Sequence, residues 1–244
     1  VMVIDAAKGV EAQTIKLFKV CTLRHIPIFT FVNKMDREAR DPFELMENIE
    51  EILGIKTYPM NWPISCGKDF KGVYDRSAKR VLAFSSDGRA NGVKMVDEVE
   101  AELGDAALDE LIGTVNHEKL AEDIELLDGA AEEFDLEAVQ HGELSPVFFG
   151  SALTNFGVEP FLKEFLRLPP APLPRKDAAS GELVDPCSEQ FSGFVFKIQA
   201  NMNKNHRDRI AFLRICSGKF ERGMEAFHVQ EGKNIKLATG TSLM

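Results

Sequence analysis

The stretch FVNKMDRE, residues 31–38, ends an apolar run abruptly with an amide, a cation and a carboxylate. The apolar run itself, residues 26–32, predicts a strand that is buried inside a sheet. Residues 41–54 then carry helix signals, namely Asp at the N-cap, Pro at the first position, an apolar face and a closing Gly. A strand, a polar turn and a helix in this order predict a parallel sheet with right-handed crossovers.

The same pattern appears on both sides of this unit. Residues 1–4 form a short apolar run, which predicts a strand buried on both faces, and a helix is expected over residues 15–22. Residues 147–149 predict a third strand, and residues 158–168 predict the helix that follows it. We therefore expect an α/β domain over residues 1–168.

Within this domain the pattern loosens, and residues 58–145 look like an insertion. Short strands are expected at residues 72–75 and 79–84, and acidic surface helices at residues 93–103 and 120–127. Charge runs of this kind are usually solvated faces. We therefore expect the two helices to expose their acidic faces to water.

A proline-rich segment, residues 169–190, reads as a stiff polar linker between two domains. Beyond it, residues 191–199 and 209–218 alternate apolar and polar side chains, as antiparallel strands do, and a polar turn joins them. Residues 191–244 are therefore expected to form the first part of a β-sheet or β-barrel domain.

Composition excludes several classes of protein. The chain has 244 residues, 44% hydrophobic and 28% charged, which is typical of a globular protein. A formal charge of −10 argues against a surface that binds nucleic acid over its whole area. The four cysteines are widely spaced and predict neither disulfides nor a zinc site, and no apolar run is long enough to span a bilayer. Because the chain starts and stops within expected elements, we interpret it as an internal fragment.

Two polar segments directly follow expected strands, at the edge of a parallel sheet where ligands bind. Both segments carry candidate ligand-binding residues: Asn33, Lys34, Asp36, Ser151, Ala152 and Leu153. Because the carboxyl ends of parallel strands meet at one edge, we expect the two segments to form one site.

These residue types suit a guanine base, which offers two donors, N1–H and the exocyclic amine, beside the acceptor O6. A fixed Asp36 carboxylate would accept both donors, and the backbone N–H of Ala152 would donate to O6. The aliphatic stem of Lys34 would cover one face of the ring, while Asn33 and Ser151 hold the loops and orient Asp36. Adenine lacks the donor pair, so we expect it to be rejected by several orders of magnitude.

A simpler interpretation treats residues 31–38 as a capped strand-to-helix turn that binds nothing. The spacing NKxD alone is a weak signal, because three fixed residues recur by chance in unrelated chains. Its position after an apolar strand, and the second polar segment after another strand, favour the guanine site.

Longer segments carry a family resemblance. NKMD, residues 33–36, resembles the base-reading motif of GTP-binding proteins, and GSAL, residues 150–153, resembles its partner loop. Further segments resemble the bacterial peptide chain release factor 3 family of translational GTPases: TFVNKMDREARDPFELMENIEEILGI, WPISCGKDFKGVYDR, PVFFGSALTNFGV and FSGFVFKIQANMNKNHRDRIAFLRICSG. The resemblance covers nearly the whole chain.

The resemblance implies a P-loop-type GTPase domain that lacks its N-terminal part, followed by the start of a translation-factor β-barrel. It implies a cytoplasmic GTPase that promotes recycling of class I release factors from the ribosome, with no membrane partner. GTP or GDP would be bound with Mg²⁺, whose ligands are expected upstream of Val1. The phosphate-binding loop and the catalytic residues are also expected upstream, so no catalytic or metal-binding residue is assigned and the chain alone should hydrolyse no GTP.

Two other interpretations stay open. One keeps the enzyme class but assigns an elongation factor G-like or ribosomal protection GTPase. The other is a non-catalytic ribosome-binding module, in which a basic cluster of Lys204, His206, Arg207 and Arg209 contacts ribosomal RNA phosphates. A solvated turn, in which Asp208 offsets part of the charge, explains the same residues.

Overall fold

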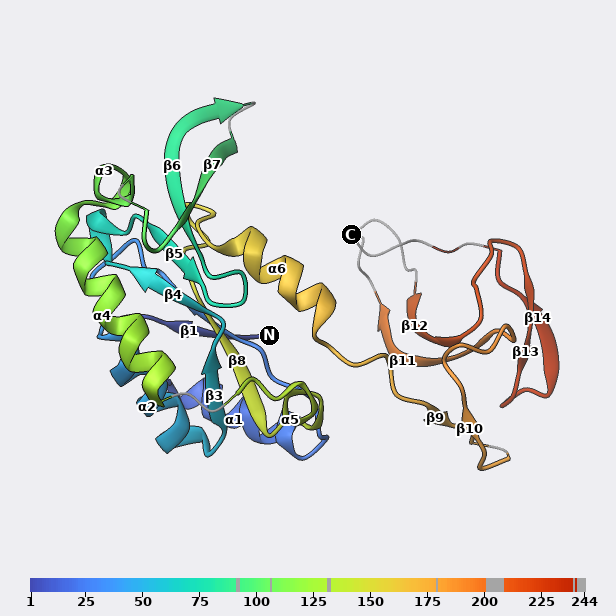
Figure 1. Ribbon diagram of the computed structural model, residues 1–244. Coiled ribbons are helices and arrows are strands. Elements are labelled where there is room, and N and C mark those ends of the chain that lie inside the picture. The colour runs from blue at the N-terminus through green and yellow to red at the C-terminus, as the bar shows by residue number, and fades with distance from the viewer. Residues whose placement is uncertain are drawn as a thin grey trace. The chain divides into compact units, whose positions relative to one another are not determined.

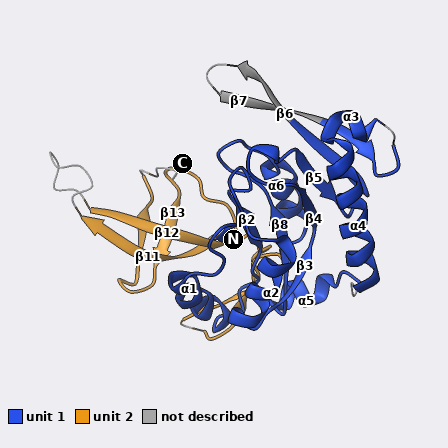
Figure 2. Cartoon of the chain, turned by 90° about the vertical axis from the view of Figure 1, so that its left-hand side faces the viewer, with its two compact units in different colours: residues 1–169 blue, residues 170–244 orange. Residues whose placement is uncertain are grey.

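The computed structural model describes residues 1–90, 93–105, 107–130, 133–178, 180–200, 209–238 and 240, with the backbone alone for 85–90 and 93–98. The chain divides into two compact units, Val1–Pro169 and Pro170–Met244 (Figure 2). Three residues of the predicted basic cluster, Lys204, His206 and Arg207, lie outside the described residues.

The centre of unit 1 is a four-stranded parallel sheet. Its strands, in spatial order, are β1 (Met2–Asp5), β2 (Thr30–Asn33), β8 (Leu144–Phe149) and β3 (Lys56–Pro59) (Figure 1). The predicted parallel sheet is therefore confirmed. The sequence pattern does not predict β3, because its segment KTYP lacks an apolar run and forms a strand only by pairing with β8.

Helices cover both faces of this sheet. Successive residues of a strand point to opposite sides, so each strand contributes to two cores. Val32 and Phe149 face one core, and Phe31 and Phe148 face the other. The first core includes residues from two helices, α1 (Ala12–Thr22) and α2 (Pro42–Leu53). The second includes residues from α5 (Leu136–His141) and α6 (Val158–Arg167).

Strand β1 is less buried than the sequence predicts. Ile4 is buried, but Val1 and Val3 expose 63% and 56% of their surface. The prediction of a strand buried on both faces is therefore wrong for residues 1–4. The physical reason is position: β1 is an edge of the described sheet, and its one neighbour there is β2.

Helix α2 begins and ends as the sequence predicts. The Asp41 carboxylate accepts hydrogen bonds from the backbone N–H groups of Phe43 and Glu44, at 2.9 and 3.4 Å. Gly54 ends the helix in the left-handed conformation, with φ of 68°.

Residues 60–143, between β3 and β8, make up most of the predicted insertion. They form an antiparallel sheet of β4 (Asn61–Ile64), β5 (Gly72–Asp75), β6 (Arg80–Ala90) and β7 (Val93–Glu102). In the described part of this range, four helices interrupt or follow the sheet: the 3₁₀ helix η1 (Gly67–Asp69), α3 (Leu108–Ile112), α4 (Thr114–Ala130) and α5. The strands predicted at residues 72–75 and 79–84 and the helix predicted at residues 120–127 are confirmed.

The helix predicted at residues 93–103 is wrong, because this segment is strand β7. Its acidic residues favour a helix on composition, but Val99 and Ala101 recur with the period of a strand. They lie opposite Ala83 and Val81 in the antiparallel ladder with β6. Pairing with a neighbouring strand has therefore overridden the local preference.

Trp62 of β4 anchors the insertion to the main sheet. Its side chain is fully buried, and its ring centroid lies 4.5 Å from that of Phe43 and 5.6 Å from that of Phe149. The indole N–H donates a 3.0 Å hydrogen bond to the Asp123 carboxylate of α4. One side chain thus joins the main sheet, α2 and the insertion.

His117 of α4 ties the insertion helices to the end of β7. Its ring nitrogens lie 2.9 Å from the Asp109 carboxylate and 2.7 Å from the carbonyl oxygen of Leu103. Both partners are acceptors, so the protonated ring, which donates from both nitrogens, satisfies both contacts. The hydrogen bond to Asp109, followed by that to Leu103, raises the pKa of His117 above its ordinary value.

We expect the stability of unit 1 to fall as pH rises through the folded-state pKa of His117. A raised pKa stabilises the folded state fully below the ordinary value of 6.5, and this contribution is lost above the folded value. Urea unfolding of the wild type and His117→Gln from about pH 6 to about pH 9 measures it. The difference in free energy of unfolding between the two proteins should shrink as pH rises. A difference that does not change with pH would contradict the raised pKa of His117.

Unit 2 consists of antiparallel strand pairs. They are β9 (Arg175–Lys176) with β10 (Leu183–Val184), β11 (Ser192–Ala200) with β12 (Arg209–Ser217), and β13 (Glu225–His228) with β14 (Lys233–Lys236). The strands predicted at residues 191–199 and 209–218 are confirmed as the β11–β12 pair. No helix in the described part of either unit is long and apolar enough to cross a membrane.

Candidate functional site

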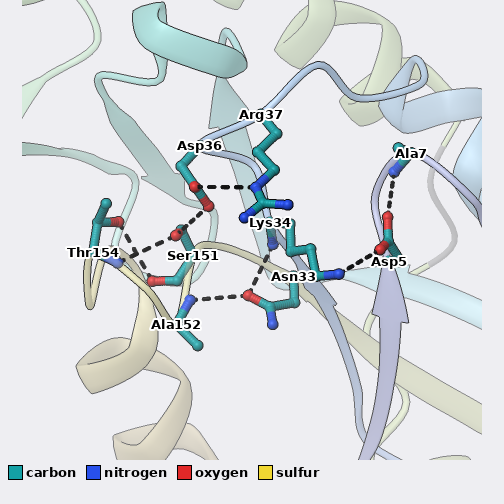
Figure 3. A network of polar contacts seen from close by, with 9 residues as sticks. All are labelled: Asp5, Ala7, Asn33, Lys34, Asp36, Arg37, Ser151, Ala152 and Thr154. Carbon is teal, nitrogen blue, oxygen red and sulfur yellow. Dashed lines mark hydrogen bonds and ion pairs between the residues drawn. The ribbon is translucent and has the colours of Figure 1, made fainter.

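The NKMD and GSAL segments leave the main sheet side by side. Val32 and Phe149 are partners in the parallel β2–β8 ladder, so the two segments begin at the same level of the sheet. Backbone hydrogen bonds then join them, from Gly150 N–H to the Val32 carbonyl at 3.0 Å and from Met35 N–H to the Gly150 carbonyl at 3.1 Å. The structure therefore brings the two predicted segments together (Figure 3).

Ser151 fixes the direction of the Asp36 carboxylate. The Ser151 hydroxyl donates a 2.5 Å hydrogen bond to Oδ1 of Asp36 and accepts one from Thr154 N–H at 3.3 Å. The other carboxylate oxygen, Oδ2, lies 4.0 Å from Nε of Arg37, whose side chain is 67% exposed. A pair this long and this exposed adds little stability, so Oδ2 stays available to a ligand.

Asn33 holds both segments through one oxygen atom. Its side-chain Oδ1 accepts hydrogen bonds from the backbone N–H groups of Lys34 and Ala152, at 2.8 and 2.9 Å (Figure 3). Two donors on one atom identify it as oxygen, so the amide nitrogen points away from the Ala152 loop. Among the described residues no hydrogen bond from this nitrogen is formed, and it remains a donor for a ligand.

Lys34 is held by Asp5, a residue that the sequence analysis did not identify. Its ammonium lies 2.7 Å from the Asp5 carboxylate, which also accepts the backbone N–H of Ala7 at 3.0 Å. Hydrogen bonding from Lys34 is the main reason that the pKa of Asp5 lies below its ordinary value. The parallel pairing of β1 and β2 places Asp5 opposite Asn33, so a predicted register would have found it.

Ala152 and Leu153 differ in what they offer to a ligand. The Ala152 N–H points into the site but already donates to Asn33, so a ligand oxygen would share this donor or displace Asn33. Leu153 is 69% exposed and presents apolar surface beside it. Of the six predicted residues, five are therefore linked by hydrogen bonds or an ion pair within the site or to Asp5, and Leu153 lies at the edge.

The arrangement suits binding of a flat polar heterocycle. It combines a fixed carboxylate, an amide donor, a shared backbone donor and the stem of a lysine whose charged end is tied to Asp5. In the described ranges, no cluster of three or more His, Cys, Asp or Glu side chains is placed to hold a metal ion.

Comparison with protein families matches both units. The model of the elongation factor Tu GTP-binding domain matches residues 1–171, and the model of elongation factor G domain 2 matches residues 190–244. The first match covers most of the chain. The predicted fold class, a GTPase domain with a parallel sheet followed by a translation-factor β domain, is therefore confirmed.

Relatives at high identity extend over the whole chain. Proteins named peptide chain release factor 3 are 56% identical in Symbiobacterium thermophilum and 51% identical in Ligilactobacillus salivarius, each over 100% of this chain. A third, in Gloeobacter violaceus, is 50% identical over 99% of this chain. The predicted resemblance is confirmed. The chain spans 46%, 46% and 45% of these relatives, about half their length.

Proposed function

Because the chain belongs to the family of elongation factor Tu GTP-binding domains, we propose that its NKMD and GSAL segments bind the guanine base of GTP or GDP. In this proposal Asp36 accepts the N1–H and amine donors of guanine, and Ala152 N–H donates to O6. The Lys34 stem covers a face of the ring, and Leu153 lies at its edge. Ser151 and Asn33 hold the two segments in place.

The fixed Asp36 carboxylate is the observation that supports the proposal most strongly. Ser151 already orients Oδ1, so the carboxylate loses little rotational freedom when a base binds. The free Asn33 amide nitrogen adds a donor that suits a purine ring nitrogen such as N7. Adenine would leave the carboxylate without its two donors and would leave a charge uncompensated.

For the whole protein we infer a GTPase of translation termination in the cytoplasm. The names of the relatives and the match to elongation factor G domain 2 support this role. The protein would promote release of class I release factors from the ribosome, and the second domain would contact small-subunit RNA. Mg²⁺ and the phosphate-binding and catalytic residues would come from chain outside these 244 residues.

The base preference of the full-length protein tests the guanine site. We expect unlabelled GDP to displace a fluorescent guanine nucleotide at least about a thousandfold better than ADP, because the carboxylate rejects adenine. Equal competition by the two nucleotides would contradict the proposal. A non-catalytic ribosome-binding module would bind ribosomes with an affinity that neither nucleotide changes.

An activity assay separates the translational roles. The proposed role predicts GTP-dependent release of a labelled class I release factor from ribosomes that hold a freed peptide. Translocation of peptidyl-tRNA by the same protein, without release-factor turnover, would instead favour the elongation factor G-like interpretation.

A further inference from the structure

We propose that the antiparallel sheet of the insertion is a positioning element of the guanine site. Gly67, which lies just after strand β4, contacts the NKMD segment, and Phe84 of β6 and Phe70 contact Phe156, which follows the GSAL segment. Both contacts restrain residues that hold Asp36. This inference rests on the proposed guanine site and adds a function for the insertion, which supplies none of the predicted base-contacting residues.

The first contact is a single backbone N–H group. Gly67, which follows β4 and opens η1, donates to the carbonyl oxygens of Met35 and Arg37 at 2.8 and 3.0 Å. These two residues flank Asp36, so one donor holds the carbonyl groups of the residues before and after it. Gly67 has a φ of +68°, a conformation that costs glycine little and other residues more.

Met35 also links the NKMD segment to the GSAL segment. Its side chain is buried in the core that the insertion and the main sheet share. Its backbone N–H donates to the carbonyl oxygen of Gly150, the residue before Ser151. The NKMD backbone is therefore held between Gly67 of the insertion on one side and the GSAL backbone on the other.

The second contact is aromatic and acts on the GSAL segment. The ring of Phe156 lies 4.9 Å from that of Phe84 in β6 and 6.0 Å from that of Phe70, which precedes β5. The Phe156 carbonyl accepts the Ser151 N–H at 2.9 Å, so the loop closes on itself. A Cβ on Gly150 would lie 2.6 Å from this carbonyl oxygen, so the close approach of the loop requires glycine at this position.

The two contacts converge on one carboxylate. Gly67 fixes the backbone around Asp36, and Phe156 fixes Ser151, whose hydroxyl donates to the Asp36 carboxylate. A carboxylate that accepts N1–H and the exocyclic amine together requires both restraints, since a small rotation lengthens one of the two bonds. The insertion sheet would therefore set how well guanine is distinguished from hypoxanthine, which lacks the amine.

The test measures the ratio of the Kd values for IDP and GDP in the full-length protein. A hydrogen bond to a charged group contributes roughly 10- to 100-fold in affinity, and we expect this ratio to fall at least about fivefold in Gly67→Ala and in Phe84→Ala. Gly67→Ala strains a backbone that has room for the added Cβ, since the nearest atom, the carbonyl carbon of Arg37, would lie 3.8 Å away. Phe84→Ala removes the ring that supports Phe156.

Two control variants make the same kinds of substitution elsewhere in the insertion. Gly113→Ala places alanine at a φ of +88° with nothing within 4 Å of the added Cβ, and Leu120→Ala truncates a buried side chain of α4. Both should lower thermal stability and leave the IDP-to-GDP ratio within about twofold of wild type. If the controls lowered the IDP-to-GDP ratio as much as the test variants do, general destabilisation would explain the effect. That result would overturn the inference.

Other outcomes separate this inference from the proposed function. Folded Gly67→Ala and Phe84→Ala proteins that keep the wild-type ratio would overturn the positioning role and leave the guanine site intact. A wild type that does not distinguish GDP from IDP would instead count against base reading by Asp36. If Phe84→Ala does not fold, Phe84→Leu keeps an apolar side chain and should give a smaller loss in the same direction.

Discussion

Asp36→Asn is expected to change the base preference of the full-length protein from guanine to xanthine. The asparagine oxygen still accepts N1–H, but its NH₂ group faces the exocyclic amine of guanine, so two donors oppose each other. Xanthine has a carbonyl at this position and accepts that NH₂ group. Because each bond to the charged carboxylate contributes about 1.5–3 kcal/mol, GDP affinity should fall at least about 100-fold.

Competition binding with GDP and XDP measures this change directly. Asp41→Asn is the matched control, because Asp41 caps helix α2 through Phe43 and Glu44 and asparagine caps a helix equally well. We expect the control to keep both affinities within about twofold. An Asp36→Asn protein that still prefers GDP would show that another residue reads the base.

Trp62→Ala is expected to give the largest loss of stability in unit 1, about 3–5 kcal/mol. The fully buried ring packs against Phe43 and Phe149, and its N–H satisfies Asp123. Truncation leaves a cavity between the main sheet and the insertion, and it also removes a hydrogen bond. The insertion sheet should therefore loosen together with the core.

Urea unfolding followed by circular dichroism measures this loss, since Trp62 is the only tryptophan and its fluorescence disappears with it. Trp62→Phe separates the two contributions, because it keeps most of the packing and removes the hydrogen bond to Asp123, at a cost of about 1–2 kcal/mol. A loss below about 1 kcal/mol in Trp62→Ala would show that the insertion is not anchored through this side chain.

Elements whose signals are local were predictable from the sequence. Helix α2 has its cap at Asp41 and its end at Gly54, and the structure shows both. The polar residues after β2 and β8 were also predictable, because apolar runs precede them and parallel strands end at one edge of a sheet. Each of these signals lies within a few residues of the feature that it predicts.

Features that depend on distant partners were not predictable in the same way. The sequence of β7 predicts an acidic helix, and only its pairing with β6 makes it a strand. The sequence of β3 gives no strand signal, and it forms a strand by pairing with β8. Asp5 and Gly67 reach the site from 29 and more residues away, by an ion pair and a backbone hydrogen bond. Such contacts follow from sheet register and loop geometry, which a single sequence does not specify.

The most direct test of the account is a crystal structure of the full-length protein with GDP. We expect one Asp36 carboxylate to lie about 2.7–3.1 Å from both N1 and the exocyclic amine of the base, with the Ala152 nitrogen at a similar distance from O6. A base bound elsewhere, or an Asp36 side chain that still contacts Ser151 but not the guanine, would contradict the account.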